Sequence, residues 1–158
     1  MNKKPTWDEY FIKIAKLVAK RSSCTSRQVG AVIVRDNMIL STGYNGTPRG
    51  IKNCDEGGCP RCEGRVKGTV KSGEKLDECV CVHAEENALL QAAYNGVSIK
   101  GATFYTSLFT CRYCTKHIIN AGIKKVYYSE DYDLDPISRK LYEEAGVKLV
   151  KYKEEKED

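Results

Sequence analysis

The sequence contains no long apolar run, and several residue types are rare in it. No stretch approaches the roughly 18 consecutive apolar residues that a membrane-spanning helix requires. Its 158 residues include only two histidines, four prolines, three phenylalanines and one tryptophan. The first residues hold no apolar segment of signal-peptide length and turn acidic at Asp8. These absences exclude a membrane-spanning helix, so we expect a cytoplasmic protein with no membrane partner.

The residues that are present give an ordinary globular composition. Hydrophobic residues make up 41% of the chain and charged residues 30%, which argues against disorder. A chain of this length can bury roughly 68–70% of its unfolded surface in one domain, so its core needs no disulfide scaffold. We therefore expect a single domain over residues 1–158. The formal net charge of +5 permits nucleic-acid binding, but the lysines are interleaved with acids. We expect no nucleic-acid partner.

Eight cysteines stand against the two histidines. Because a reducing compartment keeps thiols reduced, the remaining interpretations are metal ligands, a reactive thiol and small buried hydrophobes. Two of the cysteines, Cys111 and Cys114, lie beyond residue 110. The other six are Cys24, Cys54, Cys59, Cys62, Cys79 and Cys81. An account of function has to explain this number.

The N-terminal part of the sequence follows regular patterns. A capping box formed by Thr6 and Glu9 begins an amphipathic helix that ends near Arg21. Residues 29–34 and 38–44 are two β-rich runs separated by a short polar turn. These runs predict a β-hairpin.

No periodic pattern continues between residues 45 and 82. This segment is rich in glycine and holds five of the cysteines. A structureless segment of this length inside a compact domain is usually functional. We interpret it as an insertion that a bound metal orders.

The second half of the chain alternates between helices and strands. The patterns predict helices over 83–95, 111–121 and 135–146 and strands over 102–108, 124–129 and 147–152. This alternation implies parallel strands with right-handed crossovers. Together with the hairpin it predicts an α/β fold, a three-layer α/β/α sandwich with a mixed five-stranded sheet. The Cys-rich insertion, about residues 45–82, precedes the helix at 83, and a charged tail spans about 151–158.

Two short segments at predicted helix starts carry possible chemistry. Cys111 and Cys114 are spaced to share a helix face, and a helix N-terminus stabilises thiolates. With His83 they would give Zn²⁺ three protein ligands and leave a fourth position for water, the arrangement of a catalytic site. Glu85 lies close enough to His83 to transfer protons without binding the metal.

Each of these segments has an alternative interpretation when it is taken alone. A Cys-x-x-Cys pair is equally compatible with two small buried hydrophobes. Acidic residues after a histidine are common because helix starts favour them. The combination in neighbouring α/β units indicates zinc catalysis, since His-x-Glu followed by Cys-x-x-Cys is the signature of zinc deaminases.

Further segments resemble one known family. They are Val29–Val32, Gly43–Gly46 with Pro48 after it, His83–Ala88 and Tyr128–Tyr132. From about Trp7 to Val150 the chain resembles the cytidine deaminase-like superfamily, and within it the deoxycytidylate (dCMP) deaminases. It departs from that family at Thr110, where proline usually precedes the first cysteine.

The resemblance implies a zinc-dependent hydrolase that acts on the C–N bond of a cyclic amidine. His83, Cys111 and Cys114 would bind the catalytic zinc. Glu85 would transfer protons while activated water attacks C4 of cytosine. The reaction would convert dCMP to dUMP and ammonia and so supply dUMP for dTMP synthesis.

The resemblance also implies contacts with the nucleotide. Asn45 would hold the substrate, Ser26 and Arg27 would contact its phosphate, and Tyr132 would line the pocket near that phosphate. Each assignment has an alternative: Asn45 is also a good turn residue, Ser26 and Arg27 also suit a solvated polar link, and Tyr132 also suits the surface.

Members of this family often hold a second, structural zinc in the insertion. A closed structural site needs four ligands, and Cys59 and Cys62 form one pair by spacing. The resemblance favours Cys24, Cys54, Cys59 and Cys79. Cys62 is the alternative for one of these four, and Cys81 is expected to be a plain buried thiol.

The resemblance further implies a homo-oligomer, commonly a hexamer, regulated by dCTP, with Mg²⁺ on its phosphates, and by dTTP. Two other functions stay open. One is a zinc deaminase that acts on another base or nucleotide, such as adenosine in tRNA or dCTP. The other is a non-catalytic zinc-binding nucleic-acid module. Glu85 argues against that module, because a structural zinc site has no use for a proton-transferring carboxylate.

Overall fold

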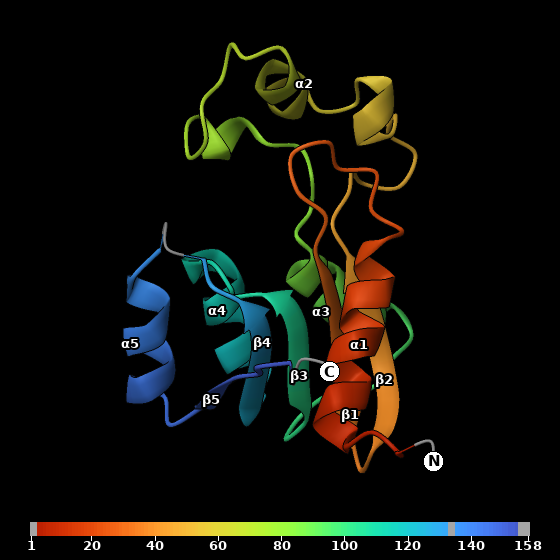
Figure 1. Ribbon diagram of the computed structural model, residues 1–158, viewed down its shortest axis with the longest axis vertical. Coiled ribbons are helices and arrows are strands. Elements are labelled where there is room, and N and C mark those ends of the chain that lie inside the picture. The colour runs from red at the N-terminus through yellow and green to blue at the C-terminus, as the bar shows by residue number, and fades with distance from the viewer. Residues whose placement is uncertain (1–2, 133–134, 155–158) are drawn as a thin grey trace.

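The computed structural model describes residues 3–132 and 135–154 and contains a five-stranded sheet covered by helices (Figure 1). The strand order is β2-β1-β3-β4-β5. Strand β1 is antiparallel to both β2 and β3, whereas β3, β4 and β5 are parallel. The strands are β1 (Gly30–Arg35), β2 (Met38–Tyr44), β3 (Thr103–Leu108), β4 (Lys125–Glu130) and β5 (Lys148–Lys151). The predicted mixed sheet and α/β class are confirmed.

Helices cover both faces of the sheet, which makes three layers. Helix α1 (Trp7–Ala19) packs on one face. On the other face lie α3 (Ala84–Tyr94), α4 (Arg112–Asn120) and α5 (Ile137–Glu144). Because both faces are covered, strand β1 is buried along almost its whole length and its residues alternate between the two cores.

Two apolar clusters hold these layers together. In the first, Phe11 and Ile12 of α1 pack against sheet residues such as Tyr105. In the second, Phe104 and Val126 of the sheet pack against α3, α4 and α5. This burial, not helix propensity, is the main source of stability for such short helices.

Glycine lets two helices approach the sheet closely. A Cβ atom at Gly30 would lie 2.0 Å from the carbonyl oxygen of Ala15 in α1. A Cβ atom at Gly43 would lie 2.3 Å from the carbonyl oxygen of Ala84 and 2.3 Å from the amide nitrogen of Ala88, both in α3. Gly43 therefore sets the distance between β2 and the start of α3.

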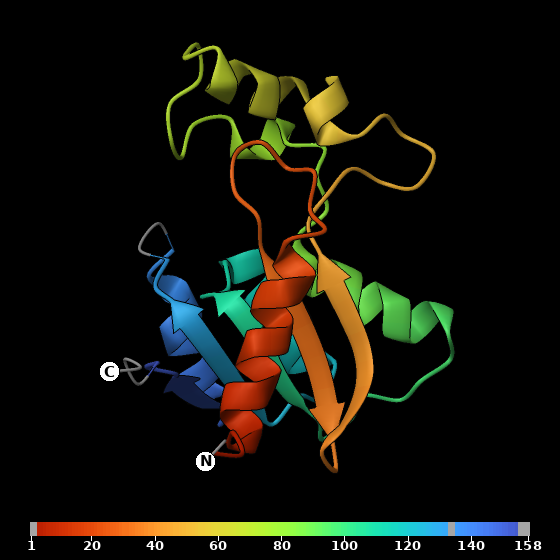
Figure 2. The ribbon, with the colours of Figure 1, turned by 45° about the vertical axis from the view of Figure 1, so that its right-hand side comes forward.

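The insertion forms a lobe beyond one end of the sheet, as both ribbon views show (Figure 1, Figure 2). Gly46 and Val82 pair at its base in an isolated antiparallel bridge. The lobe contains two 3-10 turns, η1 (Cys54–Glu56) and η2 (Leu76–Glu78), and the helix α2 (Pro60–Val66). The sequence predicted none of these elements, because they are too short to show a hydrophobic period.

Several boundaries differ from those predicted. Helix α1 ends at Ala19, with Thr6 Oγ1 accepting from the Glu9 amide at 3.2 Å, and β5 spans only four residues. Helix α5 begins after Pro136 and not at Asp135. The Asp135 carboxylate binds the neighbouring helix α4 instead of capping its own. Of the predicted tail, residues 155–158 lie outside the described residues.

Within the described part of the chain, no helix has the length and apolar character needed to cross a membrane.

Candidate metal centre and pocket

His83, Cys111 and Cys114 meet where the N-termini of α3 and α4 converge. His83 and Cys111 are the N-cap residues of these helices, and Cys114 lies in the first turn of α4. His83 Nδ1 is 3.4 Å from Cys111 Sγ and 3.3 Å from Cys114 Sγ. In tetrahedral zinc sites such nitrogen and sulfur ligands lie about 3.6 Å apart. The donor set therefore fits zinc, with three protein ligands and one open position.

Hydrogen bonds among the three side chains set their ionisation. The Cys114 thiol, followed by the His83 ring, lowers the pKa of the Cys111 thiol to about 4. The hydrogen bond to Cys111 raises the pKa of His83 to about 9, and the bond to Cys111 also raises the pKa of Cys114. Cys111 is therefore a thiolate near neutral pH, which is the form that binds a metal.

Glu85 lies beside this centre without belonging to its ligand group. Its side chain is buried, and its Oε2 accepts a hydrogen bond from Cys114 Sγ at 3.6 Å. Burial raises the pKa of Glu85 to about 7. A carboxyl with a pKa near neutrality can both accept and donate a proton in one reaction cycle.

Local hydrogen bonds hold the two helix starts in place. The His83 amide donates to Glu86 Oε2 at 3.2 Å, and Asn87 Nδ2 donates to the Tyr44 carbonyl at 2.8 Å. At α4, Asp135 Oδ2 accepts from the Arg112 amide at 2.7 Å and from Arg112 Nε at 3.2 Å. Both ligand-bearing helices are thus anchored at the end that faces the metal centre.

Thr110 occupies the position where the family usually has proline. Its hydroxyl is buried and lies 2.7 Å from Thr115 Oγ1 and 2.8 Å from the Tyr142 hydroxyl. These bonds link the residue before Cys111 to α4 and α5. Threonine therefore fixes the start of α4 by hydrogen bonding.

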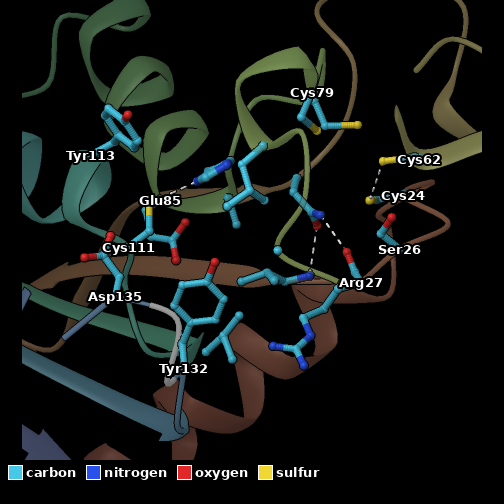
Figure 3. A pocket seen from close by; sticks show the side chains of 18 of the residues that line it. Cys24, Ser26, Arg27, Cys62, Cys79, Glu85, Cys111, Tyr113, Tyr132 and Asp135 are labelled. Carbon is cyan, nitrogen blue, oxygen red and sulfur yellow. Dashed lines mark hydrogen bonds between the residues drawn. The ribbon is translucent and has the colours of Figure 1, made fainter. Parts of the chain in front are cut away.

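A cavity of about 540 Å³ opens beside the metal centre. This volume lies within the range of about 300–1,000 Å³ that is usual for small-molecule sites. Figure 3 shows Glu85 and Cys111 on one side of it and Cys24, Cys62 and Cys79 on the other. The pocket therefore lies between the insertion and the sheet with its flanking helices, which we call the sheet domain.

All four residues predicted to contact the substrate line this cavity, namely Ser26, Arg27, Asn45 and Tyr132. The Asn45 amide is engaged within the protein: Oδ1 accepts from the Val29 amide at 2.8 Å, and Nδ2 donates to the Arg27 carbonyl at 2.7 Å. Asn45 thus holds the loop that carries Arg27, and one N–H of its side chain remains for another partner.

Sequence reasoning missed several cationic pocket residues. Arg61, Lys75 and Arg112 line the cavity together with Arg27. The Arg61 side chain is buried, with its Nε donating to the Glu74 carbonyl at 3.0 Å. Only the position of Arg61 inside the Cys59 to Cys62 motif hinted at a role, and nothing in the sequence marked Lys75. The cations make the cavity suitable for an anionic ligand.

The remaining six cysteines gather between the insertion and the connection that follows α1. Their sulfur atoms form two four-membered groups within which all ligand atoms lie within 4.8 Å of one another. One group is Cys24, Cys54, Cys62 and Cys81, and the other is Cys59, Cys62, Cys79 and Cys81. The structure therefore differs from the predicted set of Cys24, Cys54, Cys59 and Cys79.

This correction has a simple physical cause. Cys24 contacts Cys62 at 3.9 Å, whereas Cys59 contacts Cys79 at 3.8 Å, so the predicted four are divided between two groups. Cys81 is not a separate thiol but belongs to both groups. Its thiol hydrogen-bonds to Cys24 and Cys79 and lowers the pKa of each to about 5. Spacing along the chain cannot show which sulfur atoms of a folded loop meet.

Comparison with known proteins gives the same family as the sequence motifs. The family model of the cytidine and deoxycytidylate deaminase zinc-binding region matches residues 5–130. The deoxycytidylate deaminase of Schizosaccharomyces pombe is 47% identical over 149 residues, which cover 94% of this chain and 45% of that protein. The deoxycytidylate deaminase of Mycobacterium phage D29 is 41% identical over 129 residues, which cover 81% of this chain and 98% of that protein.

Among solved structures, the chain is similar to the dCMP deaminase of the cyanophage S-TIM5 in complex with dCMP and dUMP. The TM-score is 0.77 at 32% identity, and the match covers 96% of this chain and 100% of the other. The chain spans less than half the length of two yeast relatives, since the Saccharomyces cerevisiae deoxycytidylate deaminase is covered to 46%.

Proposed function

The chain belongs to the cytidine and deoxycytidylate deaminase family, and on this premise we propose that it hydrolyses dCMP to dUMP and ammonia. One observation carries the proposal: a His-Cys-Cys centre with an adjacent buried carboxyl opens into a cavity lined by cations. A cytosine ring directed at the centre and a phosphate directed at the cations would use both halves of this pocket.

Glu85 is the residue that moves protons in this proposal. When bound, zinc supplies a Lewis acid that makes water acidic enough to act as a nucleophile near neutral pH. Glu85 Oε2 takes a proton from the water that adds to C4 and delivers it to N3 of the ring. It then passes the second proton to the leaving amine, so that water and dCMP become dUMP and ammonia. The raised pKa of Glu85 suits both transfers.

The cations in the pocket favour a nucleotide, which carries a phosphate, over a nucleoside, which has none. Arg27, Arg61 and Lys75 come from two separate parts of the chain and line the same cavity. Hydrogen bonds between guanidinium or ammonium groups and phosphate are among the strong ones. Ser26 adds a hydroxyl to the cavity lining, Tyr132 lines the pocket near the phosphate, and Asn45 offers its remaining N–H.

We also propose the finer features that the family resemblance implies. The protein is a cytoplasmic homohexamer that supplies dUMP for dTMP synthesis and is regulated by dCTP, with Mg²⁺ on its phosphates, and by dTTP. Exposed apolar side chains on α3, among them Leu90 and Tyr94, support a subunit interface. Light scattering after size-exclusion chromatography measures the subunit count.

A substrate panel tests the proposed activity. Ammonia release is measured from dCMP, CMP, dCTP and deoxycytidine, each with and without added dCTP or dTTP where these are not the substrate. We expect dCMP to be the best substrate. If none of the four is deaminated while adenosine in tRNA is, the proposed substrate is wrong.

A further inference from the structure

Six cysteine sulfur atoms form the core of the insertion lobe. The described apolar cluster in this region consists of cysteines alone, with Cys54, Cys59, Cys62 and Cys81 buried and Cys24 and Cys79 packed against them. The six belong to different elements: Cys24 follows α1, Cys54 begins η1, Cys59 and Cys62 begin α2, and Cys79 and Cys81 follow η2. A lobe held together by thiols alone would have little apolar area to stabilise it.

The sulfur separations fit metal coordination. A disulfide joins sulfur atoms at about 2.05 Å, whereas Cys24 Sγ lies 3.9 Å from Cys62 Sγ and Cys59 Sγ lies 3.8 Å from Cys79 Sγ. Four thiolates around a tetrahedral zinc, each at about 2.3 Å, lie about 3.8 Å apart. Each of the two four-membered cysteine groups thus contains one pair of sulfur atoms at the separation expected around zinc.

The two groups overlap in a particular way. Each contains four sulfur atoms within 4.8 Å of one another, which is a complete ligand set for a closed zinc site. They share Cys62 and Cys81 and nothing else. A single ion in the first group would leave Cys59 and Cys79 without a metal, and a single ion in the second would leave Cys24 and Cys54 without one.

We propose that the insertion holds two zinc ions that share Cys62 and Cys81 as bridging thiolates. Cys24 and Cys54 complete the first tetrahedron, and Cys59 and Cys79 complete the second. Six thiolates around two Zn²⁺ leave a formal charge of −2, whereas the same six thiolates around one ion would leave −4. Zinc clusters with six cysteines are an established chemistry of small protein modules. The inference does not depend on the proposed dCMP deamination.

The cluster also connects the insertion to the pocket. Cys24 lies two residues before Ser26, and Cys81 lies two residues before His83. Through Cys24, the first ion thus fixes one end of the loop that carries Ser26 and Arg27. Through Cys81, both ions fix the start of α3. The binuclear cluster positions these pocket residues and has no part in the chemistry itself.

The zinc content of the purified full chain tests the proposal directly. Protein prepared under reducing conditions without added chelator is analysed by native mass spectrometry and by elemental analysis. We expect about three zinc ions per chain, one at His83, Cys111 and Cys114 and two in the insertion. A content of two ions that falls to one in Cys111→Ser, or any lower content in the wild type, would overturn the binuclear cluster.

Single substitutions distinguish bridging from terminal ligands. Cys54→Ser and Cys59→Ser should each lower the zinc content by about one ion, whereas Cys62→Ser should lower it by about two. Cys111→Ser is the matched control, because it should lose only the ion of the other centre. Loss of a single ion in Cys62→Ser, or no loss in Cys54→Ser or Cys59→Ser, contradicts shared coordination.

Anomalous diffraction from wild-type crystals at the zinc edge keeps the test independent of how the variants fold. We expect two separate anomalous peaks among the six sulfur atoms. A single peak there would overturn the proposal.

Discussion

The buried hydroxyl of Thr110 joins three parts of the molecule beside the metal centre. It lies within hydrogen-bond distance of Thr115 in α4 and Tyr142 in α5, and all three side chains are fully buried. A buried hydroxyl that loses its partner costs more than the bond itself contributes, because the group stays desolvated. The residue before Cys111 is therefore a stabilising position as well as a neighbour of a ligand.

Thr110→Val should lower the free energy of unfolding by about 1–3 kcal/mol, because it removes the partner of the buried Thr115 and Tyr142 hydroxyls. Urea unfolding of the zinc-loaded protein measures the change. Thr110→Ser keeps the hydroxyl and should be much less destabilised. A Thr110→Val variant as stable as the wild type would show that these hydrogen bonds do not stabilise the fold.

Arg27 is an exposed cation at the rim of the pocket. Arg27→Met should raise the KM for dCMP by about tenfold, because an exposed charge-assisted bond to phosphate has a modest free energy. The KM or kcat/KM for deoxycytidine, which lacks the phosphate, should not change. Arg21→Met, an exposed arginine that does not line the pocket, is the matched control. An equal loss with both substrates would argue against a phosphate contact.

At the scale of elements, the start of α3 is positioned by its close packing on β2. This helix carries His83 and Glu85, and Gly43 is the point of closest approach. Gly43 does not line the pocket, but it affects the metal centre because it sets how closely α3 approaches the sheet. Backbone packing, as well as side chains, thus places the metal ligands.

Gly43→Ala should destabilise the fold by about 1–3 kcal/mol and lower zinc occupancy at His83, because the new Cβ would press on the backbone of α3. Thermal unfolding and zinc analysis measure both effects. Gly46→Ala is the control in the same segment, since a Cβ there would meet nothing within 4 Å. If the two variants behave alike, the close approach is not what positions α3.

Hydrophobic patterns and the signals for helix ends were enough to predict the sheet and the four helices that flank it, because both are local features of the sequence. Local spacing was enough for Cys111 and Cys114, which share one helix turn. The same reasoning failed for α2, whose core is made of cysteines and not of a periodic apolar stripe. It also failed for Asp135, whose carboxylate binds Arg112 on a neighbouring helix, a contact that no local pattern reveals.

At the scale of the whole molecule, the pocket is formed jointly by the sheet domain and the insertion lobe. The sheet domain supplies the metal centre, and the lobe supplies Arg61 and Lys75. The sequence could identify the group of His83, Cys111 and Cys114 but not these lobe residues, since the positions of the lobe residues depend on how six cysteines fold a glycine-rich loop. The structure of the lobe therefore depends on the metal content of the protein.

Removal of zinc should loosen the lobe selectively. With a chelator, amide hydrogen exchange should accelerate across residues 53–81, where local stability depends on the cysteine cluster, while β1, β3 and β4 stay protected in their apolar core. Cys111→Ser without chelator should leave the lobe protected. Unchanged exchange in the lobe after metal removal would contradict a metal-dependent lobe.

The central claim is that Glu85 moves protons at a zinc centre that deaminates dCMP. The most direct test follows dUMP formation and zinc content together in the wild-type protein and in Glu85→Gln, which keeps the shape of the side chain. We predict that the wild type forms dUMP and that the variant retains its zinc while kcat falls by at least about 100-fold. Substantial turnover by the zinc-loaded variant would contradict the account.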